Sequence, residues 1–264
     1  MTIGMRAFGP LAMQGLLALV LAFLYVPVLV MMAMAFNSSA LYELPMVADT
    51  IWFERLATNE KLIRAGLNSV ALALANTAVA TVLGTMAALA LSRYTFRGRA
   101  LLRALLLPPI TIPWLIIGTS MLVLFFWTGI GRGLHAMLLG HVALSLPYVI
   151  VVVGARLKSF GPALEEAAAT LGASPWQAFR RVTLPVIAPG VVAAALFAFA
   201  VSFDQFVISY FLAPPGVSTL PVEIYSSIRK GFTPEINAIS TIIILVSMGL
   251  MLTVARLYRF GGER

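Results

Sequence analysis

The chain has 264 residues, of which 61% are hydrophobic and only 11% charged, with a net charge of +8 and no cysteine. Soluble domains carry about 25% charged residues, so the composition indicates an integral membrane protein and excludes disulfides and thiolate metal sites. The basic residues lie in a few loops and no basic helix interleaves aromatic residues, so nucleic acid is not an expected partner.

The first apolar run covers residues 8–42, contains no charged residue and follows Arg6. A cleaved signal peptide is the alternative to a transmembrane helix, because Ala33-Met34-Ala35 resembles a cleavage site. The apolar core of a signal peptide is about 7–15 residues long, and this run is much longer. Its length favours a retained transmembrane helix over residues 11–36.

The remaining apolar segments predict the fold class. A helix needs about 20 mostly apolar residues to cross a bilayer. No repeat and no low-complexity linker is visible, so we expect a single transmembrane domain over residues 1–264, with an N-terminal helix and a core at 65–255. The prediction is an all-α membrane protein with six transmembrane helices at 11–36, 65–91, 105–127, 134–155, 187–212 and 238–255.

Three prolines interrupt the start of the third predicted span: Pro108, Pro109 and Pro113. Proline removes a helical N–H group and kinks or breaks a helix. Two interpretations fit this pattern equally: a broken helix that lines a pathway, or a tilted segment leading into the membrane.

The loop charges predict the orientation, because Lys and Arg are enriched in cytoplasmic loops. In one set of loops basic residues far outnumber the acids, which are Glu165, Glu166 and Glu263; in the opposite set the two kinds balance. The asymmetry places both termini and the loop around Glu166 in the cytoplasm, as six spans require. The basic residues of the first set are Arg6, Arg93, Arg97, Arg99, Arg103, Arg156, Lys158, Arg180, Arg181, Arg256, Arg259 and Arg264.

A polar segment separates the fourth and fifth predicted spans, with the sequence GPALEEAAATLGASPWQAFRRVTLPVIAPG at residues 161–190. Pro162 can begin a helix, and Gly172 can adopt the left-handed conformation that ends it. Ser174 and Pro175 can begin a second short helix. The segment therefore predicts a helix–turn–helix on the membrane face, and by spacing alone it fits a connector on lipid headgroups as well as a docking surface.

The same segment contains Glu166-Ala167-Ala168, Gly172 six residues after the glutamate, and Leu184-Pro185. This combination resembles the cytoplasmic coupling loop of bacterial ABC-importer permeases and has the position that the family requires. The resemblance implies the type I ABC-importer permease fold, with a coupling loop at 161–185 that docks on an ATPase subunit. The ATPase-coupling residues that it implies are Glu165, Glu166, Ala167, Ala168, Leu171, Gly172 and Trp176.

Further stretches resemble one branch of this family, the second permease subunit of spermidine/putrescine importers. The branch implies an importer of a small cationic solute, most of all a polyamine, in the bacterial inner (cytoplasmic) membrane. Its partners would be a second, homologous permease subunit, two nucleotide-binding ATPase subunits and a periplasmic or extracellular solute-binding protein. The stretches are 92–98 (SRYTFRG), 154–158 (GARLK), 202–211 (SFDQFVISYF), 219–221 (TLP), 224–226 (IYS) and 233–238 (TPEINA).

No cofactor is expected in this chain, because ATP and Mg²⁺ would bind to the ATPase subunits and the sequence has no Walker motif. His135 and His141 have no acidic or cysteine partner at ligand spacing, so no metal site is expected and both histidines are expected to be packed or interfacial.

Asp204 is the acidic residue predicted to lie inside a span, near its external end. A buried carboxylate is costly unless it is paired or faces water. It can be a counter-charge for a cationic solute, with aromatic rings nearby, or it can pair helices through Ser202, Ser209, Thr119 or Ser120. The substrate-pathway residues that we expect are Asp204, Gln205, Phe203, Tyr210 and Phe211.

The polyamine branch often has two adjacent acids at this point, whereas this chain has Asp204-Gln205. One carboxylate fewer leaves an alternative solute open: a singly charged amine, a 4-aminobutyrate-like or another amino-acid-like compound. Gln205 could then hydrogen-bond a carboxylate or an amide of that solute.

Two other classes of function fit the sequence less well. An intramembrane enzyme needs a nucleophile and a base that converge in the membrane; Ser120 or Ser145 with His141 are the candidates, but no nucleophile-elbow glycine pattern surrounds either serine. An ATP-independent channel or transporter would account for Asp204 but not for the loop around Glu166. No catalytic residue is therefore expected.

Overall fold

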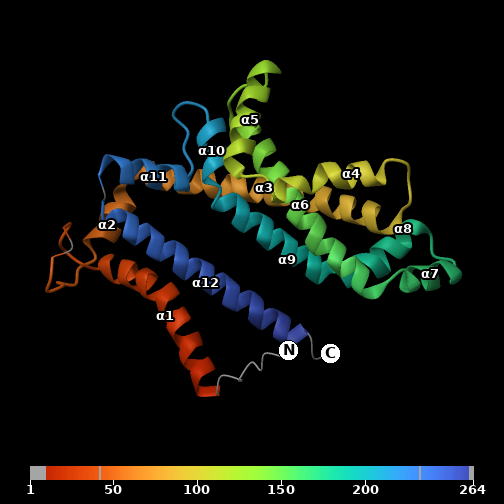
Figure 1. Cartoon of the computed structure of the whole chain (residues 1–264), viewed down its shortest axis with the longest axis horizontal. Coiled ribbons are helices and arrows are strands. Elements are labelled where there is room, and N and C mark those ends of the chain that lie inside the picture. The colour runs from red at the N-terminus through yellow and green to blue at the C-terminus, as the bar shows by residue number, and fades with distance from the viewer. Residues whose placement is uncertain (1–9, 42, 232, 262–264) are drawn as a thin grey trace, which may run out of the picture. The chain divides into compact units, whose positions relative to one another are not determined.

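A computed structural model describes residues 10–41, 43–231 and 233–261 of the chain (Figure 1). Within these residues the regular elements are helices, with one isolated β-bridge between Asn37 and Ala48, so the predicted all-α class is confirmed. The helices are α1 (Pro10–Met34), α2 (Ile51–Thr58), α3 (Glu60–Arg93), α4 (Arg99–Leu106), η1 (Pro108–Ile110), α5 (Trp114–Trp127), α6 (Leu134–Phe160), α7 (Ala163–Thr170), α8 (Pro175–Ala178), η2 (Phe179–Thr183), α9 (Leu184–Phe203), α10 (Phe206–Leu212), α11 (Leu220–Lys230) and α12 (Glu235–Gly261).

In the described residues, four helices are long and apolar enough to cross a bilayer. They are α1, α3, α6 and the continuous helix that α8, η2 and α9 form over Pro175–Phe203. α12 contributes a shorter apolar stretch at Glu235–Gly249, where the sixth span was predicted. The structure therefore confirms several apolar helices, while the count of six spans stays a prediction.

The predicted third span, residues 105–127, is not one helix. Arg99–Ile110 and Trp114–Trp127 are bent by 114° at the break between them and can count together as a fifth candidate span. Pro108 and Pro113 explain the bend, because each lacks a backbone N–H and disfavours helical geometry in the residue before it.

The predicted fifth span, residues 187–212, is also broken. α9 ends at Phe203 and α10 begins at Phe206, so Asp204 and Gln205 form a non-helical step between them. No proline or glycine lies at this step, which is why the sequence predicted a continuous helix. We call residues 203–206 the helix break.

By its contacts the chain separates into two compact units, residues 1–63 with 226–264 and residues 64–225. In the first unit, α12 contacts both α1 and α2. The indole of Trp52 donates a 2.6 Å hydrogen bond to the backbone carbonyl of Asn37, and the rings of Phe36 and Phe53 lie 4.9 Å apart. None of the apolar window of α1 is buried in the chain, so its surface is available to lipid.

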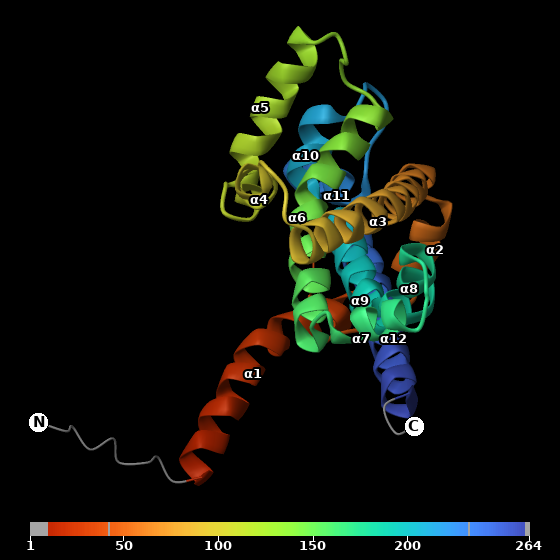
Figure 2. The same cartoon turned by 90° about the vertical axis from the view of Figure 1, so that its right-hand side faces the viewer.

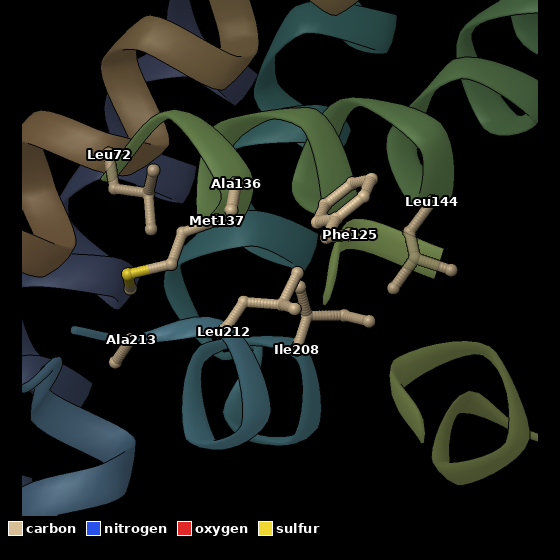
Figure 3. Close-up of a cluster of buried hydrophobic side chains, with 8 residues drawn as sticks. All are labelled: Leu72, Phe125, Ala136, Met137, Leu144, Ile208, Leu212 and Ala213. Carbon is tan, nitrogen blue, oxygen red and sulfur yellow. The ribbon is translucent and has the colours of Figure 1, made fainter. Parts of the chain in front are cut away.

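In the second unit, α6 is the central helix and lies beside α9 (Figures 1 and 2). One end of α6 buries Val149, Val153 and Leu157 against α9. Its other end packs with α5 and α10 in a second core cluster (Figure 3). That cluster consists of Leu72, Phe125, Ala136, Met137, Leu144, Ile208, Leu212 and Ala213.

Two glycines allow neighbouring helices to approach α6 closely. A Cβ atom at Gly140 would lie 2.5 Å from Cγ2 of Ile208, and one at Gly84 would lie 2.5 Å from Cγ1 of Val149. Ile208 and Val149 are fully buried, so neither can move aside easily. Small residues commonly occupy such contacts in membrane proteins.

We therefore expect Gly140→Ala to destabilise the protein relative to Gly154→Ala in the same helix. Both changes gain about 1 kcal/mol of helix propensity, but only the first adds overpacking, which costs about 1–3 kcal/mol. A Cβ at Gly154 meets no atom within 4 Å. The midpoint of denaturant unfolding in detergent measures the difference; equal midpoints for the two variants would contradict the close contact.

Candidate functional site

Asp204 lies at the helix break, where it is the C-terminal cap residue of α9. Its side chain is exposed in the chain rather than buried in the helical core. In the part of the chain that the structure describes, its carboxylate takes part in no hydrogen bond or ion pair. Of the four partners considered for helix pairing, Ser202 and Ser209 lie at hydrogen-bond distance from His141 and Thr119 donates to carbonyls of its own helix. The choice between helix pairing, which also named Ser120, and a solute site stays a prediction.

His141 holds the two sides of the helix break together. Its Nδ1 lies 2.7 Å from Oγ of Ser202 on α9, and its Nε2 lies 3.0 Å from Oγ of Ser209 on α10. All three side chains are at least 97% buried. The expectation of a packed histidine is confirmed, and its two serine partners are residues that the sequence did not connect with it.

Gln205 is the second residue of the non-helical step and caps α10. Its Oε1 accepts a 3.0 Å hydrogen bond from the backbone N–H of Val207, which caps the first turn of α10. The side chain is only 2% exposed, and its Nε2 has no partner among the described residues. Asp204 and Gln205, adjacent in sequence, thus differ in environment: the carboxylate is exposed and the amide is interior.

Aromatic rings gather on the helices that follow the break. Phe206, Tyr210 and Tyr225 form a cluster with ring centroids 4.8–6.2 Å apart, and Phe211 meets Tyr210 edge to face at 5.5 Å. Tyr225 comes from α11, which the sequence analysis did not include among the pathway residues. Phe203 is separate and stacks on Phe199 within α9 at 5.9 Å.

The segment between α6 and α9 forms the predicted helix–turn–helix. α7 begins after Pro162, and Gly172, with φ of +84°, reverses the chain in the left-handed conformation. α8 starts with a capping box, in which Gln177 N donates to Ser174 Oγ and Ser174 N donates to Gln177 Oε1. These local signals predicted α7, the turn at Gly172 and the start of the second helix, but that helix is not short: it continues through η2 into α9 and ends at Phe203.

Most of the residues expected to couple to an ATPase lie on the surface of this segment. Leu171 is 89% exposed and Trp176 67% exposed, although Trp176 also stacks against Phe179 at 5.5 Å. Glu166, Ala167 and Gly172 are exposed, and Ala168 is half-buried. Large apolar side chains at such exposure are typical of a surface that contacts something else.

Glu165 differs from the other residues of this set. Its Oε2 lies 2.8 Å from Nε of Arg93 at the end of α3, and its Oε1 accepts a 2.8 Å hydrogen bond from Thr183. The guanidinium of Arg93 also donates to the carbonyls of Leu157 and Gly161. Glu165 therefore faces the membrane helices rather than the exposed side of α7.

Comparison with known proteins identifies the class to which this architecture belongs. The profile of the family described as "Binding-protein-dependent transport system inner membrane component" matches residues 80–261. The chain therefore belongs to this family of membrane transport permeases, and it is a transport subunit and not an enzyme.

Among its relatives is "Spermidine/putrescine transport system permease protein PotC" of Escherichia coli (strain K12), to which it is 34% identical over 244 residues, 92% of each chain. It is 37% identical over 237 residues to "Putrescine transport system permease protein PotI" of the same strain, covering 87% of this chain and 84% of PotI. The resemblance to the polyamine branch is thus confirmed as homology.

Solved structures show the same fold. A bacterial ABC transporter that imports the acidic polysaccharide alginate matches with a TM-score of 0.74, covering 93% of this chain and 92% of that chain at 20% identity. The MetNI methionine ABC transporter matches with a TM-score of 0.65, covering 77% of this chain and 97% of that one at 19% identity. The fold is that of ABC-importer permeases.

The contacts of His141 predict a large effect of removing it. His141→Phe leaves two buried hydroxyl groups without their partner, and each lost interhelical hydrogen bond costs about 0.6–1.7 kcal/mol in a membrane protein. His135→Phe is the matched control, because His135 lies on the same helix but is exposed. A lower unfolding midpoint for His141→Phe alone, measured in mixed detergent micelles, is the expected result.

Proposed function

We propose that this chain, an ABC-importer permease, carries a polyamine such as putrescine or spermidine across the bacterial inner membrane. This proposal depends on the helix break. At the break the side chain of Asp204 is exposed at the surface of the chain and not buried between its helices. The identity to PotC and PotI over most of the chain supports the same class of solute.

An exposed carboxylate within an apolar segment suits a cationic solute. Leaving a charge in hydrocarbon is costly, so ionisable residues in membrane segments usually face a polar pathway or a partner. In this chain the side chain of the adjacent Gln205 is only 2% exposed, so its amide, including the unpartnered Nε2, is not presented at the surface of the chain. The group offered to a solute is therefore the anion of Asp204, which favours an amine over a compound that needs a carboxylate-binding amide.

The tyrosines near the break add faces that can bind an ammonium group. Tyr210 is 43% exposed and Tyr225 40% exposed, and their ring centroids lie 6.2 Å apart. A cation within about 6 Å of an aromatic centroid gains roughly 0.5–2 kcal/mol. A carboxylate and two phenol rings are a suitable set for one amino group of a polyamine.

For the membrane arrangement we propose six spans: α1, α3, the bent pair of α4 and α5, α6, α9 and α12. α12 would complete the count, since its residues continue beyond the apolar stretch at Glu235–Gly249. The distribution of Lys and Arg supports cytoplasmic termini and a cytoplasmic segment between α6 and α9.

We further propose that the segment at residues 161–185 docks on an ATPase subunit. Its exposed apolar side chains, Leu171 and Trp176, follow an acidic first turn in α7. The complete importer would contain a second, homologous permease subunit, two ATPase subunits that bind ATP and Mg²⁺, and a periplasmic or extracellular solute-binding protein. ATP-driven movement of α7 would then expose the solute near Asp204 to alternate sides of the membrane.

The docking surface is tested with Trp176→Ala and Tyr94→Ala. The two side chains are almost equally exposed, at 67% and 64%, but Tyr94 lies directly after α3 and outside the docking segment. Interface tryptophans are frequent hot spots, so Trp176→Ala should weaken binding of the co-purifying ATPase subunit about tenfold or more. The dissociation constant in nanodiscs measures it; unaltered affinity for Trp176→Ala would refute the docking surface.

The solute is tested by ATP-dependent uptake of labelled putrescine in proteoliposomes containing the whole importer and its binding protein. Spermidine should compete best, 4-aminobutyrate weakly and a quaternary amine at an intermediate level. Asp204→Asn should raise KM for putrescine at least about tenfold, since a hydrogen bond to a charged group contributes about 1.5–3 kcal/mol.

Asp49→Asn is the matched control, because Asp49 is the other aspartate of the chain and lies in the loop before α2. Its carboxylate accepts hydrogen bonds from backbone N–H groups, a role that asparagine can keep. If 4-aminobutyrate competes best, the solute is amino-acid-like. If Asp204→Asn transports normally, Asp204 does not bind the solute.

A further inference from the structure

The ends of several helices meet at one polar cluster, formed by Arg93, Glu165 and Thr183. We propose that this cluster, here called the Arg93 joint, is the rigid connection through which movement of α7 reaches the membrane helices. The proposal rests on the function proposed above, because it takes α7 as the part that the ATPase moves. Arg93 and Glu165 act in it as positioning residues and touch neither solute nor nucleotide.

The geometry of the joint connects four elements at once. Arg93 occupies the last turn of α3; its Nη2 donates to the carbonyls of Leu157 and Gly161, at 3.2 Å and 2.7 Å, at the end of α6. Its Nε lies 2.8 Å from the carboxylate of Glu165 on α7. That carboxylate accepts a 2.8 Å hydrogen bond from Thr183, the residue directly before α9.

The electrostatics of the helix ends favour this arrangement. The last carbonyls of a helix lack intrahelical partners and carry partial negative charge, so a guanidinium at the ends of α3 and α6 is stabilised. Glu165 lies in the first turn of α7, where the partial positive charge of a helix start stabilises a carboxylate. Arginine bonds the carboxylate through Nε and the carbonyls through Nη2, two nitrogens of one planar group, whereas lysine has a single nitrogen and cannot reproduce this geometry.

The joint is also enclosed. The side chains of Arg93 and Glu165 are 14% and 22% exposed, and the guanidinium lies 4.8 Å from the ring centroid of Phe160. Thr183 is 3% exposed. Partial burial reduces screening by salt, so this pair contributes more than an ion pair on the open surface.

The joint links α7 to the membrane helices through polar side chains, in addition to the proximity of α7 to α8 and η2. None of its residues is buried, so apolar packing does not fix α7 to the membrane helices. Its one carboxylate that faces inward is that of Glu165, whereas the next residue, Glu166, is exposed. The two adjacent acids therefore have different tasks: Glu166 lies on the proposed docking surface, and Glu165 connects that surface to α3, α6 and α9.

The joint predicts that α7 and the end of α3 move as one body. The natural chain has no cysteine, so spin labels can be placed at Thr95→Cys and Ala169→Cys, two exposed positions on either side of the joint. Double electron–electron resonance on the assembled importer then gives the distance between the labels, without nucleotide and with ATP trapped. The measurement needs no solute, so it stays readable even if the proposed solute is wrong.

In the otherwise unaltered chain the distance should change by less than about 2 Å between the two states, the size of an ordinary helix shift. Arg93→Gln should broaden the distribution and make it depend on nucleotide, whereas Arg97→Gln, which alters an exposed arginine four residues further on, should not. A nucleotide-dependent distance in the unaltered chain, or a narrow, constant one in Arg93→Gln, would overturn the joint.

Transport gives a second readout that a merely structural role would not produce. Arg93→Gln should keep ATPase binding and ATP hydrolysis but raise the ATP consumed per imported solute at least about fivefold, within the range of typical coupling free energies. A proportional loss of hydrolysis and uptake would contradict the joint.

If Arg93→Gln does not assemble, Thr183→Val and Glu165→Gln, which each remove one contact, take its place in both measurements. An unaltered importer that moves no polyamine would refute the proposed solute, not the joint.

Discussion

A helix break inside a membrane segment must be satisfied by the protein itself, because hydrocarbon offers no hydrogen bonds to free backbone groups. At the break after Phe203 the backbone N–H groups of Asp204 and Gln205 donate to the carbonyls of Ala200 and Ser202, and side chains make three further contacts. Gln205 accepts from the first turn of α10, and His141 bridges the serines on either side. The placement of Asp204, and hence the proposed solute site, depends on these three polar contacts.

A second layer of polar contacts lies one helical turn away from the break, within the same compact unit. Asn76 on α3 donates to Ser145 on α6 and to the carbonyl of Ala198 on α9, both at 3.0 Å. Ser145 lies four residues after His141, and Ala198 four before Ser202, so the two polar layers are stacked one helical turn apart. Together they fix α9 against α6 near the break, whereas the apolar cluster toward the other end of α9 provides only non-directional packing.

The sequence predicted those parts of the structure whose causes are local. Pro162, Gly172 and Ser174 determine the loop before α9 through backbone preferences and a capping box, which act over a few residues. The break after Phe203 was not predicted, because its surroundings are helix-compatible and the side chain that bridges it belongs to a histidine more than 60 residues earlier in the chain. Arg93 could be recognised as a loop charge, but nothing in its neighbours indicates its contact with Glu165.

This contrast between local and distant contacts also explains why the sequence analysis assigned the same role to the two adjacent acids of α7. The family resemblance assigned both Glu165 and Glu166 to ATPase coupling, because a sequence motif matches positions along the chain and does not show in which direction each side chain extends from the helix. Successive residues of a helix differ by about 100° in direction, so two neighbours can rarely face one partner equally. The proposed coupling to an ATPase needs one side chain directed toward the ATPase subunit and another directed toward the membrane helices. α7 has an acidic side chain on each, with Glu166 exposed and Glu165 bound to Arg93 and Thr183.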